Sequence, residues 1–262
     1  MNPRRDAAAY AASREMERRT AIVAGARLQY VVAGVGAPVI VFLNGARMPL
    51  DSWFRVLPAA ARLGTTFAYD RPGTGGSDPP SGEQSGTTIV DTLRTVLEVA
   101  GLGAPYILVG HSLGGLYANL FARTHPHEVV GVVLVDSATP GDVLDGPPAG
   151  SLARVINAAV AIVDRLRGQR DGELESVEAT LAQIEVAPAF PPIHLVVITG
   201  GRRMPLVPAP AFQAHVDNQR ELVGLSPFGR QVIARTSGHF PQLDEPALVI
   251  EAIRDVIERV RP

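Results

Sequence analysis

The sequence contains no cysteine among its 262 residues. This absence excludes disulfide bonds, thiolate metal ligands and a cysteine nucleophile, and it is compatible with either redox compartment. Long apolar runs are missing as well, because no stretch reaches the ~18 consecutive positions that a membrane-spanning helix needs. We therefore expect no membrane partner. Because cysteine is missing, any covalent catalysis must use a nucleophile other than a thiol.

An excess of charge of one sign is also missing. The chain has 24 Lys and Arg residues and 26 Asp and Glu residues, which gives a formal net charge of −2. Such a balance predicts no nucleic-acid partner. Arginines gather before residue 20, but acidic residues alternate with them, which indicates a solvated helical extension over residues 1–19. The apolar stretch at residues 7–12 is too short for a signal peptide, so we expect a cytoplasmic protein.

The most informative segment that is present covers residues 105–120, where a buried strand turns directly into a helix. The residues before Gly110 are apolar and partly β-branched, whereas apolar residues after Leu113 recur at helical intervals. The hydrophobic period therefore changes at Ser112. Gly110 and Gly114 would let the helix pack against the strand despite a strained backbone. This pattern predicts a nucleophile elbow that presents the Ser112 hydroxyl, with a tightly packed glycine-rich turn as the alternative.

Apolar strands and amphipathic helices alternate along the chain, whose length suits one large domain. Strands buried on both faces and separated by helices indicate a mostly parallel α/β sheet covered on both sides. We predict strands at residues 20–24, 27–33, 38–43, 66–69, 106–109, 129–135, 193–199 and 230–236, and helices at residues 51–61, 87–99, 211–223 and 243–260. Functional residues in such sheets lie at the carboxyl ends of the strands.

Residues 139–191 interrupt this alternation between the core segments 20–138 and 192–262. Two helical stripes occur there, formed by Leu152, Val155, Ile156, Ala159, Val163 and Leu166 and by Leu174, Val177, Leu181 and Ile184. Two helices inserted between strands predict a small lid over the strand ends. Ordinary packing helices would show the same periodicity.

The choice of a catalytic base follows from the placement of the histidines. A serine hydroxyl becomes nucleophilic when a nearby base takes its proton, and imidazole suits this task near neutral pH. Only His239 follows a terminal strand, in a loop from which its ring could reach Ser112. The other five lie in the elbow, near the end of its helix, at a strand start or within a predicted helix, and they are His111, His125, His127, His194 and His215. We predict His239 as the base, with a structural loop histidine as the alternative.

A catalytic imidazole also needs a buried carboxylate that orients it and stabilises its protonated form. Asp136 directly follows the apolar strand 129–135, whereas the next strand end, at residues 199–203, offers no acid. We predict Asp136 as this acid; helix capping or a structural salt bridge is the alternative. Three weaker candidates lie in loop or helical segments and are Asp142, Asp145 and Asp217.

Negative charge that develops on a substrate carbonyl oxygen must meet preorganised hydrogen-bond donors. The backbone N–H of Leu113 at the elbow is one such donor. The loop after the third strand contains a glycine that permits close approach, so the Ala46 N–H is predicted as the second. We expect the Asn44 side chain to brace this loop, and Asp70 and Arg71 to hydrogen-bond within their own turn.

Residues 20–262 together resemble the α/β-hydrolase superfamily, whose motifs appear in its order. These are the Asn44-Gly45 loop, the turn Asp70-Arg71-Pro72-Gly73, the elbow Gly110-His111-Ser112-Leu113-Gly114-Gly115, the acid, the lid and Gly238-His239. The resemblance implies the α/β-hydrolase fold with eight strands, and Ser112, Asp136 and His239 as nucleophile, acid and base. Asn44 stands where the family usually has histidine, and the acid follows the sixth strand instead of the seventh.

The resemblance implies acyl transfer that needs no metal or organic cofactor. We expect a serine hydrolase that acts on carboxylic esters of small or medium hydrophobic substrates through an acyl-enzyme, with a small molecule as its partner. The superfamily also admits lactonase, thioesterase, carbon–carbon hydrolase, acyltransferase and cofactor-independent perhydrolase or haloperoxidase activity. A ligand-binding receptor with negligible turnover is the alternative of a different class.

Overall fold

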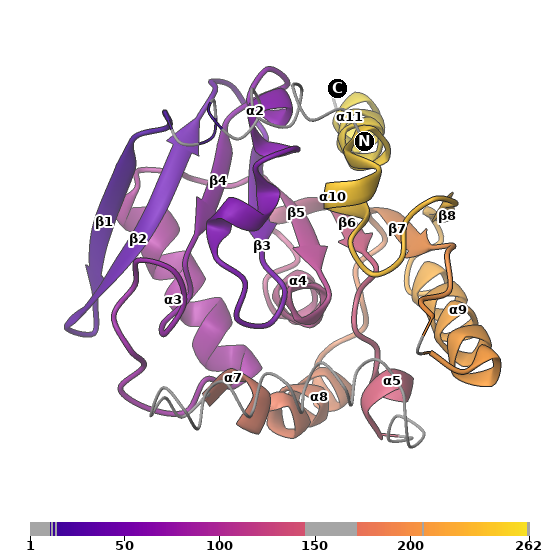
Figure 1. Cartoon of the computed structure of the whole chain (residues 1–262). Helices are drawn as coiled ribbons and strands as arrows, with labels where there is room; N and C mark the ends of the chain where they lie inside the picture. Colours follow the sequence, from indigo (N-terminus) through magenta and orange to yellow (C-terminus); the bar gives the residue numbers. More distant parts are fainter. Residues whose placement is uncertain (1–10, 12, 14, 145–171, 206, 261–262) are drawn as a thin grey trace.

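The chain forms one sheet of eight strands with helices on both faces (Figure 1). The computed structural model describes residues 11, 13, 15–144, 172–205 and 207–260. The strand order is β1-β2-β4-β3-β5-β6-β7-β8; the pairs β1–β2 and β2–β4 are antiparallel, and the pairs from β4 to β8 are parallel. The predicted eight-stranded, mostly parallel α/β sheet is confirmed.

The elements lie within a few residues of their predicted positions. The strands are β1 (Arg18–Val23), β2 (Ala26–Ala33), β3 (Val39–Leu43), β4 (Thr66–Tyr69), β5 (Tyr106–His111), β6 (Val129–Val135), β7 (His194–Gly200) and β8 (Gly229–Ala234). The described helices are η1 (Leu50–Trp53), α2 (Leu57–Ala60), α3 (Gly86–Val99), α4 (Leu113–Thr124), α5 (Pro140–Leu144), α7 (Gly172–Glu175), α8 (Val177–Val186), α9 (Ala209–Val223), α10 (Pro241–Asp244) and α11 (Pro246–Val260). The helix predicted at residues 51–61 is divided into η1 and α2.

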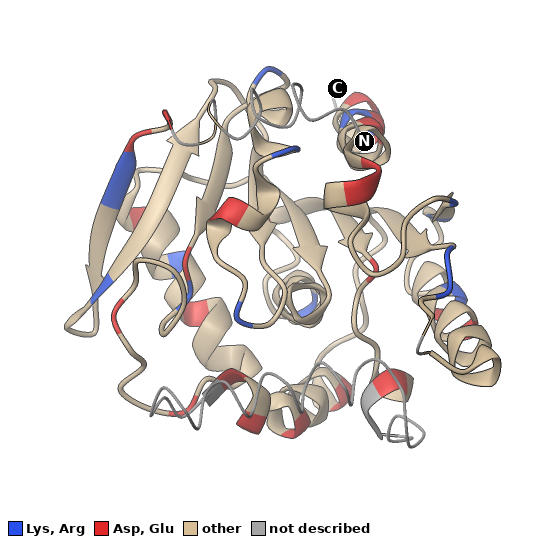
Figure 2. Cartoon of the chain, viewed as in Figure 1, with Lys and Arg blue, Asp and Glu red and all other residues tan. Residues whose placement is uncertain are grey.

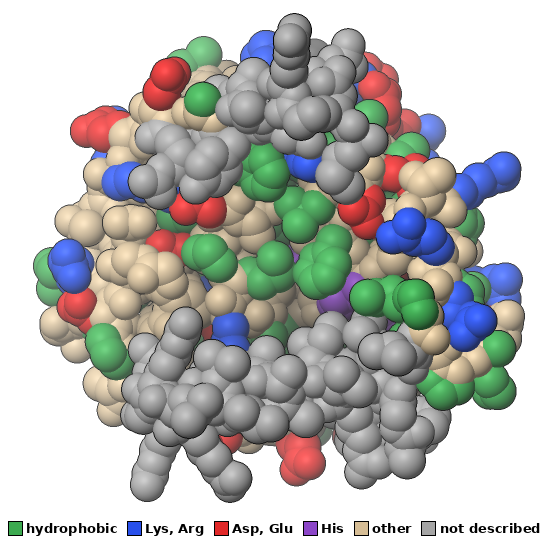
Figure 3. Space-filling view, viewed as in Figure 1, with side chains coloured by type: hydrophobic (Ala, Val, Ile, Leu, Met, Phe, Trp, Pro, Cys, Tyr) green, Lys and Arg blue, Asp and Glu red, His purple; other side chains and the backbone are tan. Residues whose placement is uncertain are grey.

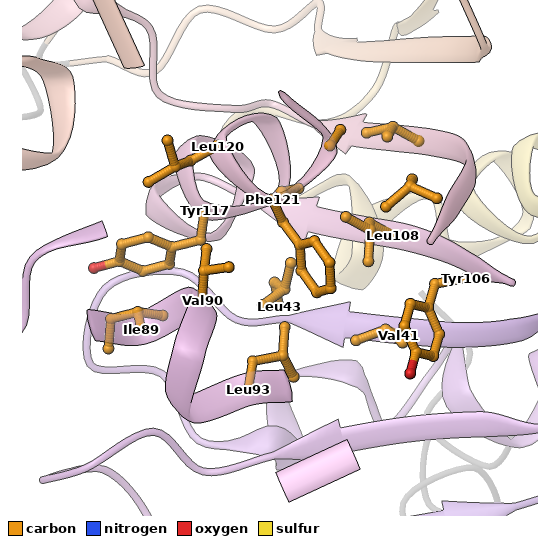
Figure 4. Packing of buried hydrophobic residues seen from close by; sticks show 14 of the residues in the cluster. Val41, Leu43, Ile89, Val90, Leu93, Tyr106, Leu108, Tyr117, Leu120 and Phe121 are labelled. Carbon is orange, nitrogen blue, oxygen red and sulfur yellow. The ribbon is translucent and has the colours of Figure 1, made fainter. Parts of the chain in front are cut away.

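Alternating side chains of the strands fill two separate cores. Val41 and Leu43 of β3 pack with α3 and α4, whereas Ile40 and Phe42 pack on the opposite face with α2 and α11. Figure 4 shows the first core, where Phe121 of α4 lies among aliphatic side chains of the sheet and α3. Helices cover both faces of the sheet, so a substrate could reach it only at an edge. Because the central strands are parallel, the polar residues that follow them lie together at the edge formed by the carboxyl ends.

The C-terminal helix differs from the prediction because it is broken at Glu245. Pro246 restricts the backbone of the residue before it, and Glu245 has the non-helical angles φ −131° and ψ 56°. Its carboxylate instead accepts the backbone N–H groups of Thr236 and Ser237 at 2.6 and 2.9 Å. The break thus supports the loop that follows β8.

Parts of the predicted N-terminal extension (1–19) and lid (139–191) fall outside the described residues, and the first helical stripe of the lid lies entirely there. Within the described part, α8 packs against α3 and α4, with Leu181 and Ile184 in their core. Among the helices that the structure describes, none combines the length and apolar character needed to cross a membrane.

Candidate active site

Ser112 lies at the sharp turn between β5 and α4. Its backbone angles are φ 51° and ψ −121°, a conformation that is strained for any residue with a side chain. A Cβ atom at Gly114 would lie 2.2 Å from the carbonyl oxygen of Leu43, and one at Gly110 would lie 2.6 Å from that of Gly114. Glycine at these two positions therefore permits α4 to begin directly against β3 and β5.

Backbone hydrogen bonds hold the strained serine in place. The Ser112 N–H donates to the carbonyl oxygen of Val135 at 3.2 Å, and the Ser112 carbonyl oxygen accepts the N–H groups of Gly115 and Ala138 at 2.9 and 3.0 Å. Ser112 itself is partly exposed. The turn is thus fixed by the end of β6 and the loop after it, while the hydroxyl stays accessible.

The imidazole of His239 links the serine to a carboxylate. Its Nε2 lies 3.1 Å from Ser112 Oγ, and its Nδ1 lies 2.7 Å from Asp136 Oδ2. When Nδ1–H donates to the carboxylate, Nε2 is left as the acceptor for the serine proton. The structure therefore brings together the three side chains that the sequence singled out, across separations of 127 and 103 residues.

His111, the residue before the serine, supports the backbone of His239. Its Nε2 lies 2.8 Å from the His239 carbonyl oxygen. Complete burial lowers the pKa of His111 to about 3, so the ring is neutral and the Nε2–H tautomer donates this bond. The ring centroids of His111 and His239 lie 5.0 Å apart, and those of His111 and Phe240 lie 5.5 Å apart. His111 is therefore a neutral, buried support for the partly exposed imidazole of His239.

Asp136 directly follows β6 and has 3% of its surface exposed. Its Oδ1 accepts the backbone N–H of Gly200 at 2.7 Å, which ties it to the end of β7. Burial alone raises the pKa of this carboxyl, but the hydrogen bonds from His215 and His239 outweigh burial and hold the pKa of Asp136 well below its usual range. The carboxylate is therefore charged throughout the neutral pH range.

His215 of α9 is a second histidine on this carboxylate. Its Nε2 lies 3.1 Å from Asp136 Oδ1, and its Nδ1 lies 3.3 Å from both carboxylate oxygens of Asp142. The amide of Asn218 donates to Asp142 Oδ1 at 2.9 Å. Sequence reasoning placed His215 in a helix and gave it no role. One signal in the sequence could have indicated a role: three polar residues of that helix share one face, and they are His215, Asn218 and Gln219.

The other acid candidates lie apart from His239. Asp142 contacts His215, and Asp217 is exposed on α9, where it pairs with Arg220. Asp145 falls outside the described residues. Among the carboxylates that the structure describes, Asp136 is the one hydrogen-bonded to His239.

The loop after β3 packs beside the start of α4, and each of these two segments presents one backbone amide. The Asn44 side chain braces it by donating to the Tyr69 carbonyl oxygen at 3.0 Å and accepting Trp53 Nε1–H at 2.8 Å. The Ala46 N–H has no acceptor within the described part of the chain. Leu113 is the first residue of α4, so its N–H has no intrahelical acceptor. Both predicted donors are thus available to a bound oxygen.

The expectation that Arg71 would hydrogen-bond within its own turn is wrong, because its side chain contacts the loop after β3 and α7. Its buried guanidinium donates to the carbonyl oxygens of Asn44 and Gly45, both at 2.8 Å, and forms an ion pair with Glu173 of α7. Burial alone lowers the pKa of Arg71, but the Glu173 carboxylate outweighs burial and raises it above the ordinary value. This pair connects α7 to the loop that contains Ala46.

Other features lie away from this cluster. A hollow of about 570 Å³ is lined by residues that include Arg94, Tyr106 and Glu128. Tyr106 begins β5 and Ser112 follows its end, which places the hollow roughly 20 Å from the serine at ~3.3 Å per residue. In the described ranges, no group of three or more His, Asp or Glu side chains is arranged so that it could hold a metal ion.

Comparison with known proteins identifies the family to which the chain belongs. Residues 38–255 match the alpha/beta hydrolase fold family, and the chain belongs to this family. An uncharacterised protein of Schizosaccharomyces pombe is 42% identical over 71 residues, which are 27% of this chain and 13% of that protein. YqjL of Bacillus subtilis is 24% identical over 223 residues, 85% of each chain. The chain spans 33% or less of the length of several curated relatives that it matches.

Solved structures show the same fold at low sequence identity. A candidate lipase from Acinetobacter baumannii has a TM-score of 0.70 at 18% identity and covers 98% of this chain and 96% of its own. The epoxide hydrolase CorEH has a TM-score of 0.67 at 20% identity, covering 94% and 100%. Est816, an N-acyl homoserine lactone degrading enzyme, has a TM-score of 0.66 at 20% identity, covering 90% and 99%.

Proposed function

We propose that this protein is a serine hydrolase that acts on carboxylic esters of small or medium hydrophobic substrates through an acyl-enzyme. The observation that carries the proposal is the continuous hydrogen-bonded chain from Ser112 Oγ through His239 to Asp136. Membership of the alpha/beta hydrolase fold family supports the same chemistry.

In the acylation step, Ser112 Oγ bonds to the carbonyl carbon of the ester while its proton moves to His239 Nε2. The carbonyl electron pair moves onto oxygen, and Asp136 stabilises the imidazolium that forms. When the carbonyl re-forms, the bond to the alcohol breaks and the imidazolium protonates the alcohol. Water then repeats the sequence on the acyl-enzyme, with His239 as base, and releases the acid.

The negative oxygen formed in each step requires donors that are already in place. We assign this role to the backbone N–H groups of Ala46 and Leu113, since neither is used within the described part of the protein. Arg71 holds the carbonyl oxygens of the two residues before Ala46. The donor loop therefore has a fixed conformation before substrate binds.

The surface near the site supports a hydrophobic substrate. Figure 3 shows hydrophobic side chains gathered with a histidine in the middle of this face. Figure 2 shows acidic and basic residues interspersed over the described elements, which suits a small substrate better than a polyanion.

An ester is favoured over an amide because an alcohol leaves more easily than an amine. We assign the protein to the cytoplasm.

A lactone is a cyclic ester and would pass through the same steps, and Est816 is a lactone-degrading protein of similar fold. Lactonase activity is therefore the second candidate. A perhydrolase or an acyltransferase would differ in the molecule that accepts the acyl group, which is peroxide or an alcohol. A binding receptor would keep the pocket without turnover.

The test combines covalent labelling with a substrate panel. A fluorophosphonate should add to Ser112 of the wild-type protein and not to the Ser112→Ala variant, as measured by intact mass and peptide mapping. Nitrophenyl esters of increasing acyl length, lactones and thioesters should then be hydrolysed by the wild type alone. Binding of these compounds with neither labelling nor turnover would favour the receptor and contradict the proposal.

A further inference from the structure

The proposed catalytic carboxylate is shared by two histidines. Asp136 Oδ2 faces Nδ1 of His239 at 2.7 Å, whereas Oδ1 faces Nε2 of His215 at 3.1 Å. Oδ1 also accepts the backbone N–H of Gly200 at 2.7 Å. Each oxygen therefore has its own imidazole partner, and the plane of the carboxylate is set by groups from three separate elements.

His215 is itself held by a fixed set of contacts. Its Nδ1 faces Asp142 of α5, which is also held by the Asn218 amide one turn further along α9. Gln219 of the same helical face donates to the carbonyl oxygen of Ser137 at 2.6 Å. The side chain of His215 is 24% exposed. This face of α9 is thus built around the loop that carries Asp136.

The surroundings of His215 favour its charged form. Burial alone lowers the pKa of His215, but hydrogen bonds and attraction from Asp136 and Asp142 outweigh burial and raise it to about 10. These two carboxylates face it from the β6 loop and from α5, and His239 lies beyond Asp136. On β8, which also packs against α9, Arg230 pairs with Asp255 of α11. His215 is therefore an imidazolium at neutral pH.

We propose that His215 is a positioning residue that acts through Asp136: it fixes the carboxylate and, as a cation, offsets part of its charge, so that His239 remains an unprotonated base in more acidic solution. A carboxylate without this partner would stabilise the imidazolium of His239 more strongly. His215 takes no proton during the reaction. This inference rests on the proposed serine hydrolase function and adds to it a determinant of the working pH range.

The direct test is the pH profile of the His215→Gln variant. A glutamine amide can still donate to Asp136 but carries no charge. The acid limb of kcat/KM should shift to higher pH by about one unit, while kcat on the plateau stays within about threefold of the wild type. In His215→Ala the hydrogen bond is lost as well, so the limb should shift and the plateau kcat should also fall, by about tenfold or more.

Asp217→Asn is the matched control, because Asp217 lies on the same helix, is exposed and is not part of the cluster. Its profile should coincide with that of the wild type. Thermal unfolding of each variant at pH 7 shows whether it is folded. If His215→Gln and His215→Ala both keep the wild-type acid limb, His215 has only a structural role and the proposal is wrong.

A second readout does not depend on a substrate. Nitrogen-15 spectra of labelled histidines follow the protonation of His239 directly, and its titration midpoint should move upward in His215→Gln. An upward shift in a protein that reacts with no ester or fluorophosphonate would retain the coupling and overturn the hydrolase proposal. Labelling at Ser112 with an unchanged midpoint would retain the hydrolase and overturn the coupling.

Discussion

Two buried charges flank Ser112 and are held in different ways. On the donor side, Arg71 binds backbone carbonyl oxygens of the loop after β3 and pairs with Glu173 of α7. On the acid side, Asp136 accepts hydrogen bonds from His239 and His215. In both places the partner charge comes from a separate helix, so each side depends on a contact between distant parts of the chain.

The two sides differ in how the cation of each pair, Arg71 or His215, responds to pH. A guanidinium keeps its proton throughout the pH range in which proteins remain folded. The imidazolium of His215, whose pKa is raised to about 10, loses its proton in alkaline solution. The donor loop is therefore held by a constant charge, whereas the carboxylate is held by one that titrates. Substitutions on each side separate these contributions.

The largest fall in kcat should follow replacement of Ser112, the proposed nucleophile between the two sides. Ser112→Ala should lower kcat by about 10⁴ to 10⁶, because no acyl-enzyme can form, while thermal unfolding stays close to that of the wild type. The measurement is steady-state hydrolysis of a nitrophenyl ester. An equally active variant would rule out the acyl-enzyme.

A substitution on the acid side should lower kcat somewhat less than Ser112→Ala does. Asp136→Asn should lower kcat by about 10³ to 10⁴, because the amide neither orients the neutral His239 ring correctly nor stabilises its imidazolium. Asp217→Asn on the exposed face of α9 serves as the control and should leave kcat unchanged. A larger loss in the control than in Asp136→Asn would transfer the role of the acid to Asp217.

Breaking the donor side should act mainly on stability. Glu173→Gln leaves the buried guanidinium of Arg71 without its charge partner, and should lower the free energy of unfolding by about 3 kcal/mol in urea titrations. The matched control is Glu128→Gln, whose pairing with Arg94 is solvent-exposed and should cost less than about 1 kcal/mol. Equal losses in the two variants would show that the buried pair contributes no special stabilisation.

The last prediction concerns how the free energy of unfolding depends on pH and involves no loss of activity. The pKa of His215 is raised from 6.5 to about 10 on folding, so its contribution to stability is fully present below pH 6.5 and is lost as the pH rises through 10. The free energy of unfolding should therefore fall between these values more steeply for the wild type than for His215→Gln. Parallel curves for the two proteins would contradict the raised pKa.

The sequence predicts most of the sheet and the placement of Ser112 because these depend on local patterns. The hydrophobic period changes at Ser112, and Asp136 follows a short, β-branched apolar run that is typical of a buried strand. The break at Glu245 could also have been found, since Pro246 restricts the residue before it. These signals lie within a few residues of the feature that they predict.

The partners of the buried charges could not be predicted in the same way. His215 lies 79 residues from Asp136, and Glu173 lies 102 residues from Arg71. Each belongs to a helix whose local sequence is compatible with an exposed position. Their roles follow only when the tertiary fold places α9 and α7 beside the strand ends, which hydrophobic periodicity does not specify.

The first turn of α4 has a further consequence for evolution of this chain. Gly114 lies against the carbonyl oxygens of Leu43 and Asn44, and a Cβ atom at Gly115 would lie 1.9 Å from the hydroxyl oxygen of Ser137. Adaptation to new substrates must therefore proceed through residues outside this turn, because a larger side chain at Gly114 would collide with the end of β3 and one at Gly115 with the loop after β6. The geometry around the hydroxyl can be inherited unchanged while the surrounding pocket diversifies.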